Sequence, residues 1–428
     1  MPLIRMTTEN SRKNFRSGSH RRPQAAVSVL MPELVPVRKD LMRRLFSILI
    51  PALALATLTG CYFSFSGPFG WSASNLKTAT NLVQSAAIPT DLKALEVINA
   101  FGAIRITGAD NGPFGWSQKL TVDARTDAVV QQIASSLLCQ ADLAGDRLKL
   151  VVTVPDSREP HNFQSDLEIT VPKSVAVQTH DQYGRTEITG LNADVEAANR
   201  FGAVEVRDIS GKVRVETSYA ALKLNNTGPA TLKNQFGAID AVGIHGPLEA
   251  ETSYATLDAR DIGGTAKLRN QFGAVHVENA GDADLKTSYA ELRVKEIAGN
   301  ARLVNQFGRV AAEAITGSVR AETSYGAMDI TGPGGSFSCA NQFGGISVYA
   351  TSATLTNLEA RTSYAALTVR LPAGLKPALQ AHTSYADIES DFPVLMKPRG
   401  QDAFAGLPPG TPRINLQNQN GKIRVIGE

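Results

Sequence analysis

The chain has 428 residues, of which 43% are hydrophobic and 6% are aromatic, with 36 glycines. This composition is that of a folded protein rather than a disordered or membrane-spanning chain. Its net charge of +3 arises in the segment before Cys61, which holds ten of the 43 Lys and Arg but only three of the 40 Asp and Glu. The remainder carries 33 basic against 37 acidic residues, so the charge gives no support for nucleic-acid binding.

The segment from Met42 to Cys61 has the pattern of a cleaved export signal. Arg43 and Arg44 precede sixteen apolar or small residues, a run too short to cross a bilayer. The phrase LTGC that ends it resembles the lipobox of bacterial lipoproteins, in which the cysteine becomes the first mature residue and is acylated. We therefore expect lipidation of Cys61 and a stable N-terminal membrane anchor. By the same resemblance, Tyr62 after the cysteine favours the outer membrane.

Residues 1–60 are accordingly interpreted as leader and signal peptide, and residues 1–41 as a start codon placed too early or a long basic n-region. Residues 61–90 are predicted to be a tether. The phrase GPFGWS occurs there and again at 112–117, and we interpret it as a packing motif. Two further cysteines, Cys139 and Cys339, either form a disulfide or are two small buried thiols.

Residues 91–180 are predicted to form an N-terminal cap. Val129, Ile133 and Leu137 recur every fourth residue behind Thr126, which indicates a short amphipathic capping helix. The phrases DRLKLVVTVP and SDLEITVPKSVAVQTH predict strands around it. Such a cap closes the exposed edge of a repeat fold.

Residues 181–390 repeat two alternating phrases, NQFG and TSYA, at steps of about 18 residues over most of their length. A fixed period of this kind predicts a solenoid, in which each unit buries its apolar face against its neighbours. Within a unit, apolar and polar residues alternate as in a half-buried strand, and small residues mark two corners. The aromatic positions that carry the prediction are Phe201, Tyr219, Phe236, Tyr254, Phe272, Tyr289, Phe307, Tyr325 and Phe343.

The predicted fold is therefore all-β, a right-handed single-stranded parallel β-helix with about 18 residues per repeat and a short N-terminal capping helix. A coil of this length gives one mixed column of Phe and Tyr, whereas a coil of twice the length gives separate columns. The shared corners of the two phrases favour the shorter coil. Residues 391–428 are predicted to form a Pro-rich loop and C-terminal capping strands.

Like residues should lie above one another in such a stack, about 4.8 Å apart. The asparagines two residues before each Phe are predicted to form an inward ladder of mutually bonded amides, with Thr in the same position before Tyr; they are Asn199, Asn234, Asn270, Asn305 and Asn341. The rings can stack offset. The parity of the tyrosines with Thr and Leu places them in the core. An outward Tyr column would instead form a ribbon suited to sugar rings or a partner protein.

The phrases NQFGAI and TSYAAL, and LEITVP from Leu167, resemble the bacterial adhesin β-strand-repeat family, also called the toastrack domain. The resemblance covers about residues 90–428. It implies a β-helical, often membrane-attached protein of the cell envelope. This chain has Phe and Tyr where many members carry Ser, Asn or Gly.

Motifs for catalysis are missing from the sequence: there is no phosphate-binding loop, nucleophile elbow or calcium repeat, and the histidines lack ligand spacing. We therefore predict a protein that is not an enzyme, with no catalytic, metal or cofactor site. The predicted function is adhesion or binding of a glycan or protein at the cell surface. A periplasm-facing scaffold or envelope-stress accessory is the alternative, and a polysaccharide-active enzyme comes third.

Overall fold

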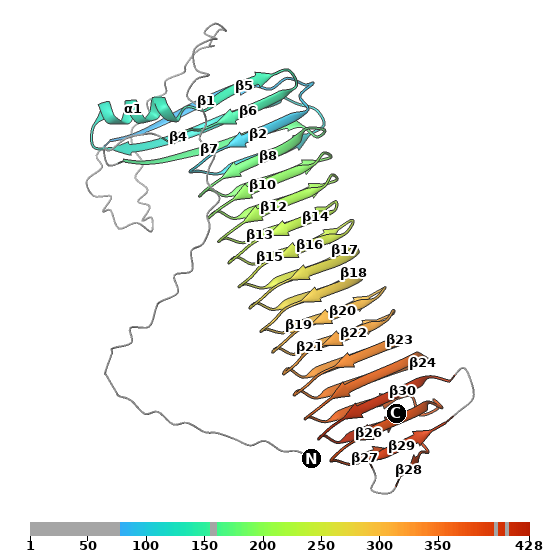
Figure 1. The fold of residues 1–428 in the computed structure, drawn as a ribbon. Helices are drawn as coiled ribbons and strands as arrows, with labels where there is room; N and C mark the ends of the chain where they lie inside the picture. Colours follow the sequence, from blue (N-terminus) through green and yellow to red (C-terminus); the bar gives the residue numbers. More distant parts are fainter. Residues whose placement is uncertain (1–77, 155–160, 398–400, 407–410) are drawn as a thin grey trace, which may run out of the picture. The chain divides into compact units, whose positions relative to one another are not determined.

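The computed structural model describes residues 78–154, 161–397, 401–406 and 411–428. These residues form 31 strands and one helix (Figure 1). The leader, Cys61 and the first GPFGWS lie outside the described residues. Strand β1 lies inside the segment that we expected to be a tether, and it pairs along its whole length with β4.

The strands form two ladders. The first ladder contains, in spatial order, β5 (Gln140–Ala144), β6 (Arg147–Val151), β2 (Ala94–Ile98), β8 (Ala176–Asp181), β10 (Val195–Asn199), β12 (Val213–Thr217), β14 (Ala230–Lys233), β16 (Leu248–Glu251), β17 (Leu257–Arg269), β18 (Val275–Lys286), β20 (Ala301–Val304), β22 (Val319–Glu322), β23 (Met328–Ala340), β24 (Ile346–Thr362), β30 (Arg413–Asn418), β26 (Ala378–Thr383), β29 (Asp402–Ala405) and β28 (Leu395–Met396).

The second ladder begins with β1 (Thr78–Ala87), β4 (Gly115–Ala124), β7 (His161–Pro172), β3 (Ile104–Ala109), β9 (Thr186–Leu191), β11 (Val204–Ile209), β13 (Leu222–Thr227) and β15 (Ile239–Ile244), and continues through β17, β18, β19 (Leu292–Ile297), β21 (Val310–Ile315), β23, β24, β25 (Leu367–Leu371), β31 (Ile423–Gly427) and β27 (Ile388–Ser390). The four longest strands of the array, β17, β18, β23 and β24, contribute to both ladders because each continues through a corner.

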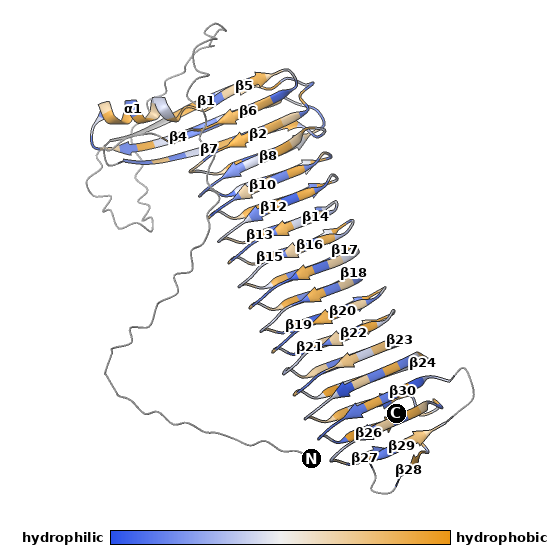
Figure 2. Cartoon of the chain, viewed as in Figure 1, coloured by the Kyte–Doolittle hydropathy of each residue, from blue (hydrophilic) through white to orange (hydrophobic). Residues whose placement is uncertain are grey.

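Each coil has two strands and one phrase, so the shorter of the two predicted coils is confirmed. Val195 lies opposite Val213 in parallel register, and Val204 lies opposite Leu222. Successive coils therefore superpose like residues, and a coil of twice this length is excluded. Hydrophobic and hydrophilic residues alternate along the strands (Figure 2), and the inward rows of Val, Leu, Ile and Ala form one continuous core.

The N-terminal cap contains the predicted helix, α1 (Asp127–Leu137), with Thr126 as its N-cap. Its apolar side, including Ile133 and Leu137, is buried in the core of the cap. Trp116 of the second GPFGWS is also buried, in agreement with a packing role. The antiparallel strands β5 and β4 cover the first parallel coil in the two ladders, so the stack of parallel coils ends here.

The C-terminal strands do not follow the order of the sequence. The pair β30 and β31 lies between the coil that contains Tyr364 and the coil that contains Tyr385 (Figure 1). The antiparallel β29 then covers the outer edge of β26. The last coil in space is therefore not the last in the chain.

A left-handed backbone conformation occurs near the end of the second-ladder strand, where the chain begins to turn, in eight coils of the array. The φ angle lies between 53° and 76° at one position in each of eight consecutive coils, namely Gly190, Asp208, Asn226, Gly243, Asp261, Asn279, Glu296 and Ala314. Gly, Asn and Asp adopt this conformation most readily, which accounts for six of the eight. Neighbouring members also bond, as Asn226 does to Asp208 at 2.6 Å.

The other corner carries the NQFG and TSYA phrases and is built by side chains that bond the preceding coil. The amide nitrogen of Asn234 donates to the carbonyl oxygen of Ala220 at 2.8 Å, and the hydroxyl of Thr252 donates to that of Gly237 at 3.2 Å. The asparagines are buried as predicted, but the predicted bonding between their amides is wrong. Because each coil carries only one phrase, Thr or Asp181 separates successive asparagines, and the amides bond backbone carbonyls instead.

In the corner phrases, Gly stands three residues after Asn, whereas Ala mostly stands three residues after Thr. This difference has a steric cause. A Cβ added to Gly237 would overlap the carbonyl oxygen of Ala220 and lie 2.6 Å from the amide nitrogen of Asn234. The Thr coils lack the second contact, since the atoms nearest to a Cβ at Gly326 belong to the backbone of Gly308 and Arg309. The overlap with the preceding carbonyl remains at Gly326, so Ala at 220, 255 and 290 also requires the two coils to stand slightly further apart there. Gly326 follows Thr323, which the same geometry allows because Gly fits either coil.

Gly237→Ala should destabilise the protein by about 1–3 kcal/mol through overpacking of the corner. The matched control is Ala220→Gly, the equivalent position of the preceding Tyr coil, where removal of a methyl group should cost no more than about 1 kcal/mol. Denaturant unfolding of both variants measures the difference. Equal costs would contradict the steric account of the two phrases.

Candidate functional site

The rings of the corner phrases form one continuous stack. From Phe101 through Tyr183 to Tyr364, neighbouring ring centroids lie 4.5–5.0 Å apart and the planes differ by 7–14°. Phe and Tyr alternate in this single column, as one phrase per coil requires. We call these twelve rings the aromatic stripe.

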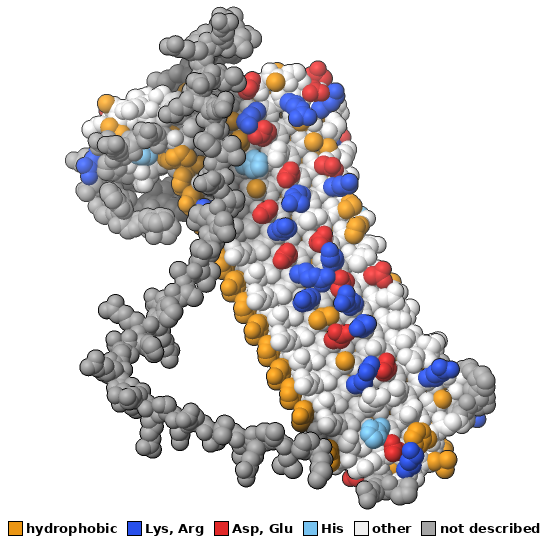
Figure 3. Space-filling model, viewed as in Figure 1, with side chains coloured by type: hydrophobic (Ala, Val, Ile, Leu, Met, Phe, Trp, Pro, Cys, Tyr) orange, Lys and Arg blue, Asp and Glu red, His pale blue; other side chains and the backbone are white. Residues whose placement is uncertain are grey.

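The aromatic stripe lies on the outside of the protein. The exposed fraction of the stacked tyrosines ranges from 44% for Tyr183 to 56% for Tyr364, and that of Phe236, Phe272, Phe307 and Phe343 from 38% to 40%. The prediction that Tyr219, Tyr254, Tyr289 and Tyr325 belong to the core is therefore wrong. The parity of a strand does not continue into the corner, where the chain turns and points the ring outward. Figure 3 shows the resulting row of hydrophobic side chains along one edge.

Stacking limits what the aromatic stripe can present. Each ring within the stack has its two faces covered by neighbouring rings, so the exposed parts are the ring edges and, in every second coil, a Tyr hydroxyl. A sugar that packs on an aromatic face therefore finds no free face between Tyr183 and Phe343. The edges remain available to apolar groups and to aromatic partners.

The stripe has a defined end at each cap. At the N-terminal end, Phe163 packs its ring edge-on against Phe101 at 5.0 Å. At the other end, Asn420 takes the ring position in the coil of β30 and β31, where its backbone amide donates to Ser363. The next ring, Tyr385, is 76% exposed and lies beyond this interruption.

Polar residues flank the stripe on the side of the first ladder. Gln and Ser alternate directly before the rings, and the serines of this row are half-buried, namely Ser218, Ser253, Ser288 and Ser324. Arg200 replaces Gln or Ser in one coil and lies over the ring of Phe201, with 5.1 Å from the guanidinium carbon to the ring centroid. This contact is a cation–π interaction.

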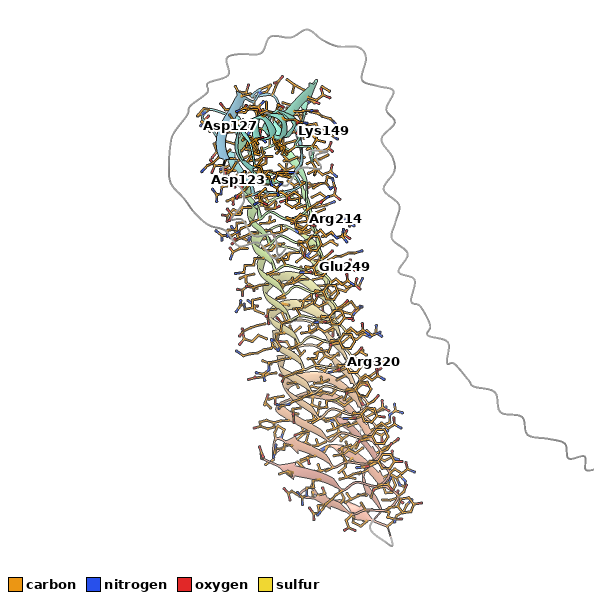
Figure 4. All side chains as sticks on the ribbon, turned by 90° about the vertical axis from the view of Figure 1, so that its left-hand side faces the viewer. Asp123, Asp127, Lys149, Arg214, Glu249 and Arg320 are labelled. Carbon is orange, nitrogen blue, oxygen red and sulfur yellow. The ribbon has the colours of Figure 1, made fainter. Side chains whose placement is uncertain are left out.

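A shallow groove runs along the outer side of the first ladder. It has a volume of about 850 Å³, and Lys149, Arg214 and Glu249 follow one another along it (Figure 4). Its cations pair with acids of neighbouring coils, as in Lys149–Glu96 at 2.7 Å and Lys267–Glu249 at 2.6 Å. The charges of the groove thus neutralise one another, and each exposed pair contributes little.

Groups that could perform chemistry are few and dispersed. Within the part of the chain that the structure describes, no three His, Cys, Asp or Glu residues gather into a metal site, and no helix is long and apolar enough to cross a membrane. Cys139 and Cys339 are both free and buried, and burial raises the pKa of each thiol to about 12. Both are therefore inert thiols under ordinary conditions.

Asp181 is the exception among the buried polar residues of the corner column. It occupies the Asn or Thr position in the coil of Tyr183 and is 5% exposed. It accepts from the backbone amide of Gln182 at 2.8 Å and the side-chain amide of Asn199 at 3.4 Å. Burial outweighs these bonds and raises the pKa of its carboxyl to about 6.

Comparison with known proteins gives a distant likeness. No family model and no curated protein matches the chain. A solved structure described as a "putative cell adhesion protein" from Clostridium sporogenes is 7% identical, covers 82% of this chain and 100% of its own, and has a TM-score of 0.19. A "putative adhesin" from Bacteroides fragilis is 15% identical, covers 59% and 97%, and has a TM-score of 0.31. Both descriptions name the class of protein that the sequence resembles.

Replacing Asp181 should remove a pH-dependent weakness of the fold. Because the folded pKa is raised from 3.8 to about 6, the protonated carboxyl favours folding, and this stability is lost as the pH rises from about 4 through 6. Asp181→Asn, which is isosteric, and Asp181→Thr, which copies the Thr coils, should each gain about 2 kcal/mol at pH 7.

Denaturant unfolding between pH 4 and pH 7 measures this effect. The control is Asp142→Asn on the exposed strand β5, which should retain the wild-type pH dependence. An unchanged pH dependence in both Asp181 variants would show that the carboxyl is not the cause.

Proposed function

We propose that this protein is a lipid-anchored component of the bacterial cell envelope and mediates adhesion through the aromatic stripe. The observation that carries the proposal is the exposure of ten of the eleven stacked rings from Tyr183 to Tyr364. The remaining ring, Phe201, is half-buried. At about 200 Å² per aromatic side chain, the exposed fractions of the ten rings amount to roughly 900 Å². The largest apolar patch of a typical monomer is about 300–600 Å², and larger patches mark interaction surfaces.

The chemistry of the stripe favours a protein partner over a glycan. Covered ring faces remove the surface on which sugars pack, whereas exposed ring edges and Tyr hydroxyls suit the aromatic-rich contacts of protein interfaces. In the groove on the first ladder, basic and acidic side chains pair with one another. The groove therefore presents no patch of a single charge that would attract a different, charged partner. A partner with an apolar strip along its own surface fits best.

The anchor supports a position at the envelope. The lipobox resemblance at Leu58–Cys61 precedes the N-terminal cap, and acylation there would hold the cap end of the stack at a membrane. Because adhesion requires access to other cells or surfaces, we propose that the protein is displayed on the outer surface and not in the periplasm.

A periplasm-facing scaffold is the second candidate. The observation that favours it is that the same rings stack one coil on the next, so the stripe also stabilises the array itself. A purely structural stripe would need no partner.

Substitution of ring residues by asparagine separates these functions. Phe236→Asn, Phe272→Asn and Phe307→Asn convert NQFG into NQNG, which is the native phrase at 418–421 and therefore folds in this corner. Combined, they should interrupt the stripe and reduce adhesion at least tenfold in cells that display the full chain.

Attachment of these cells to one another and to protein-coated and glycan-coated surfaces is the measurement, with circular dichroism as the test of folding. The control carries Thr231→Asn, Lys267→Asn and Arg302→Asn on the outer side of the first ladder and should attach like the wild type. Undiminished attachment by a folded stripe variant would refute the stripe as the adhesive surface and leave the scaffold.

A further inference from the structure

A second row of side chains runs beside the aromatic stripe on the side of the second ladder. It consists of the residue two positions after each ring, and we call it the flanking row. From the coil of Phe236 onward it reads Ala238, Thr256, Ala274, Glu291, Arg309, Ala327, Gly345 and Ala366. All eight are exposed or half-buried. Six are small, and the two large residues carry opposite charges in adjacent coils.

The order of small and charged residues in the flanking row is symmetric about its centre. Counted outward from the point between Glu291 and Arg309, three small residues follow on each side. The two coils are direct neighbours, since the backbone amide of Leu292 donates to the carbonyl oxygen of Arg309 at 2.9 Å. A two-fold axis through that point would place Glu291 opposite Arg309 of the partner subunit, and every small residue opposite a small one.

The same axis also matches the rings. It passes between the coils of Tyr289 and Phe307, so an antiparallel second copy sets each Tyr beside a Phe. The four matches on each side join position 289 to 307, 272 to 325, 254 to 343 and 236 to 364 of the other copy. In an interface with two-fold symmetry, each such contact occurs twice.

We infer that the occupant of the aromatic stripe is a second copy of this chain, bound antiparallel about an axis between the coils of Tyr289 and Phe307. This inference rests on the proposed function and names its partner. Eight rings with 38–56% exposure take part. At about 200 Å² per side chain they supply roughly 700 Å² per copy. Two copies thus bury about 1,500 Å² in total, which is the standard size of a specific interface.

Charge selects the antiparallel arrangement. A parallel copy, related by a two-fold axis along the stripe, would set the flanking row of the partner subunit on the opposite side of the stripe. Glu291 and Arg309 would then face the uncharged Gln and Ser that precede the rings and would gain no opposite charge. The side chains are accessible for the exchange, because Glu291 is 32% and Arg309 53% exposed. Their present partners, Arg293 and Asp329, lie on the same surface.

The antiparallel arrangement has a consequence for adhesion. It places the N-terminal caps of the two copies at opposite ends of the shared stripe, so two copies anchored in different membranes can bind each other. The adhesion would then be homophilic, with each cell supplying the same surface.

Charge reversal tests the inference with the full-length chain. Glu291→Arg alone sets Arg against Arg in the dimer, and Arg309→Glu alone sets Glu against Glu, so each variant should dimerise at least tenfold more weakly than the wild type. An equimolar mixture restores both opposite-charge contacts and should dimerise like the wild type. Analytical ultracentrifugation of each variant and of the mixture is the measurement.

The restored dimer also shows that both variants are folded. A wild-type chain that stays monomeric throughout, or variants that dimerise as well as the wild type, would overturn the inference. If the wild type is monomeric while the asparagine variant of the stripe still loses cell attachment, the adhesive function stands and its partner is a different protein. If both results are negative, the proposed function fails as well.

Discussion

The close approach of successive coils at the phrase corner is the constraint on which the rest of the structure depends. The backbone there leaves no space for a Cβ at the Asn-coil glycines, because the carbonyl of the preceding coil occupies it. Asn and Thr side chains bond that same carbonyl row and keep one corner directly above the next. The rings attached to these corners are consequently forced to stack at about one strand spacing.

This constraint gives the stripe two properties at once. Stacking ties neighbouring coils together, and it covers the faces that an isolated exposed ring would offer to a sugar. What remains is a ribbon of ring edges with a fixed repeat, and the flanking row of small residues lets another surface approach it closely. A rigid stripe of ring edges at a fixed spacing fits best against a partner whose side chains repeat at the same spacing. A second copy of this chain has that spacing.

The sequence predicts the period, the coil and the corners because each depends on local spacing that repeats many times. It does not predict the outward direction of Tyr254, since parity along a strand has no meaning once the chain turns. The bonding of Asn234 to a backbone carbonyl could have been found from the coil length, because Thr217 and Thr252 separate it from other asparagines. The requirement for Gly237 depends on a contact between coils that no single repeat shows.

The place of the last strands illustrates the same limit. In the chain, Thr362 is followed by Thr383, which breaks the alternation of Asn and Thr. In space, Asn418 lies between them and restores it. The alternation of Asn and Thr at the corner therefore agrees with the spatial order of the strands and not with their order in the sequence. The break in this alternation at Thr383 is the one sign of the spatial order in the sequence.

Chemical labelling of intact cells tests most directly whether the stripe faces the outside of the cell. Gln271→Cys places one thiol on an exposed position beside Phe272, while Cys139 and Cys339 are buried and unreactive. If the stripe faces the outside, a membrane-impermeant maleimide should label this variant on intact cells and label the wild type little. Addition of Cys61→Ser should remove the protein from the membrane fraction. Labelling of Gln271→Cys only after the outer membrane is opened would contradict surface display.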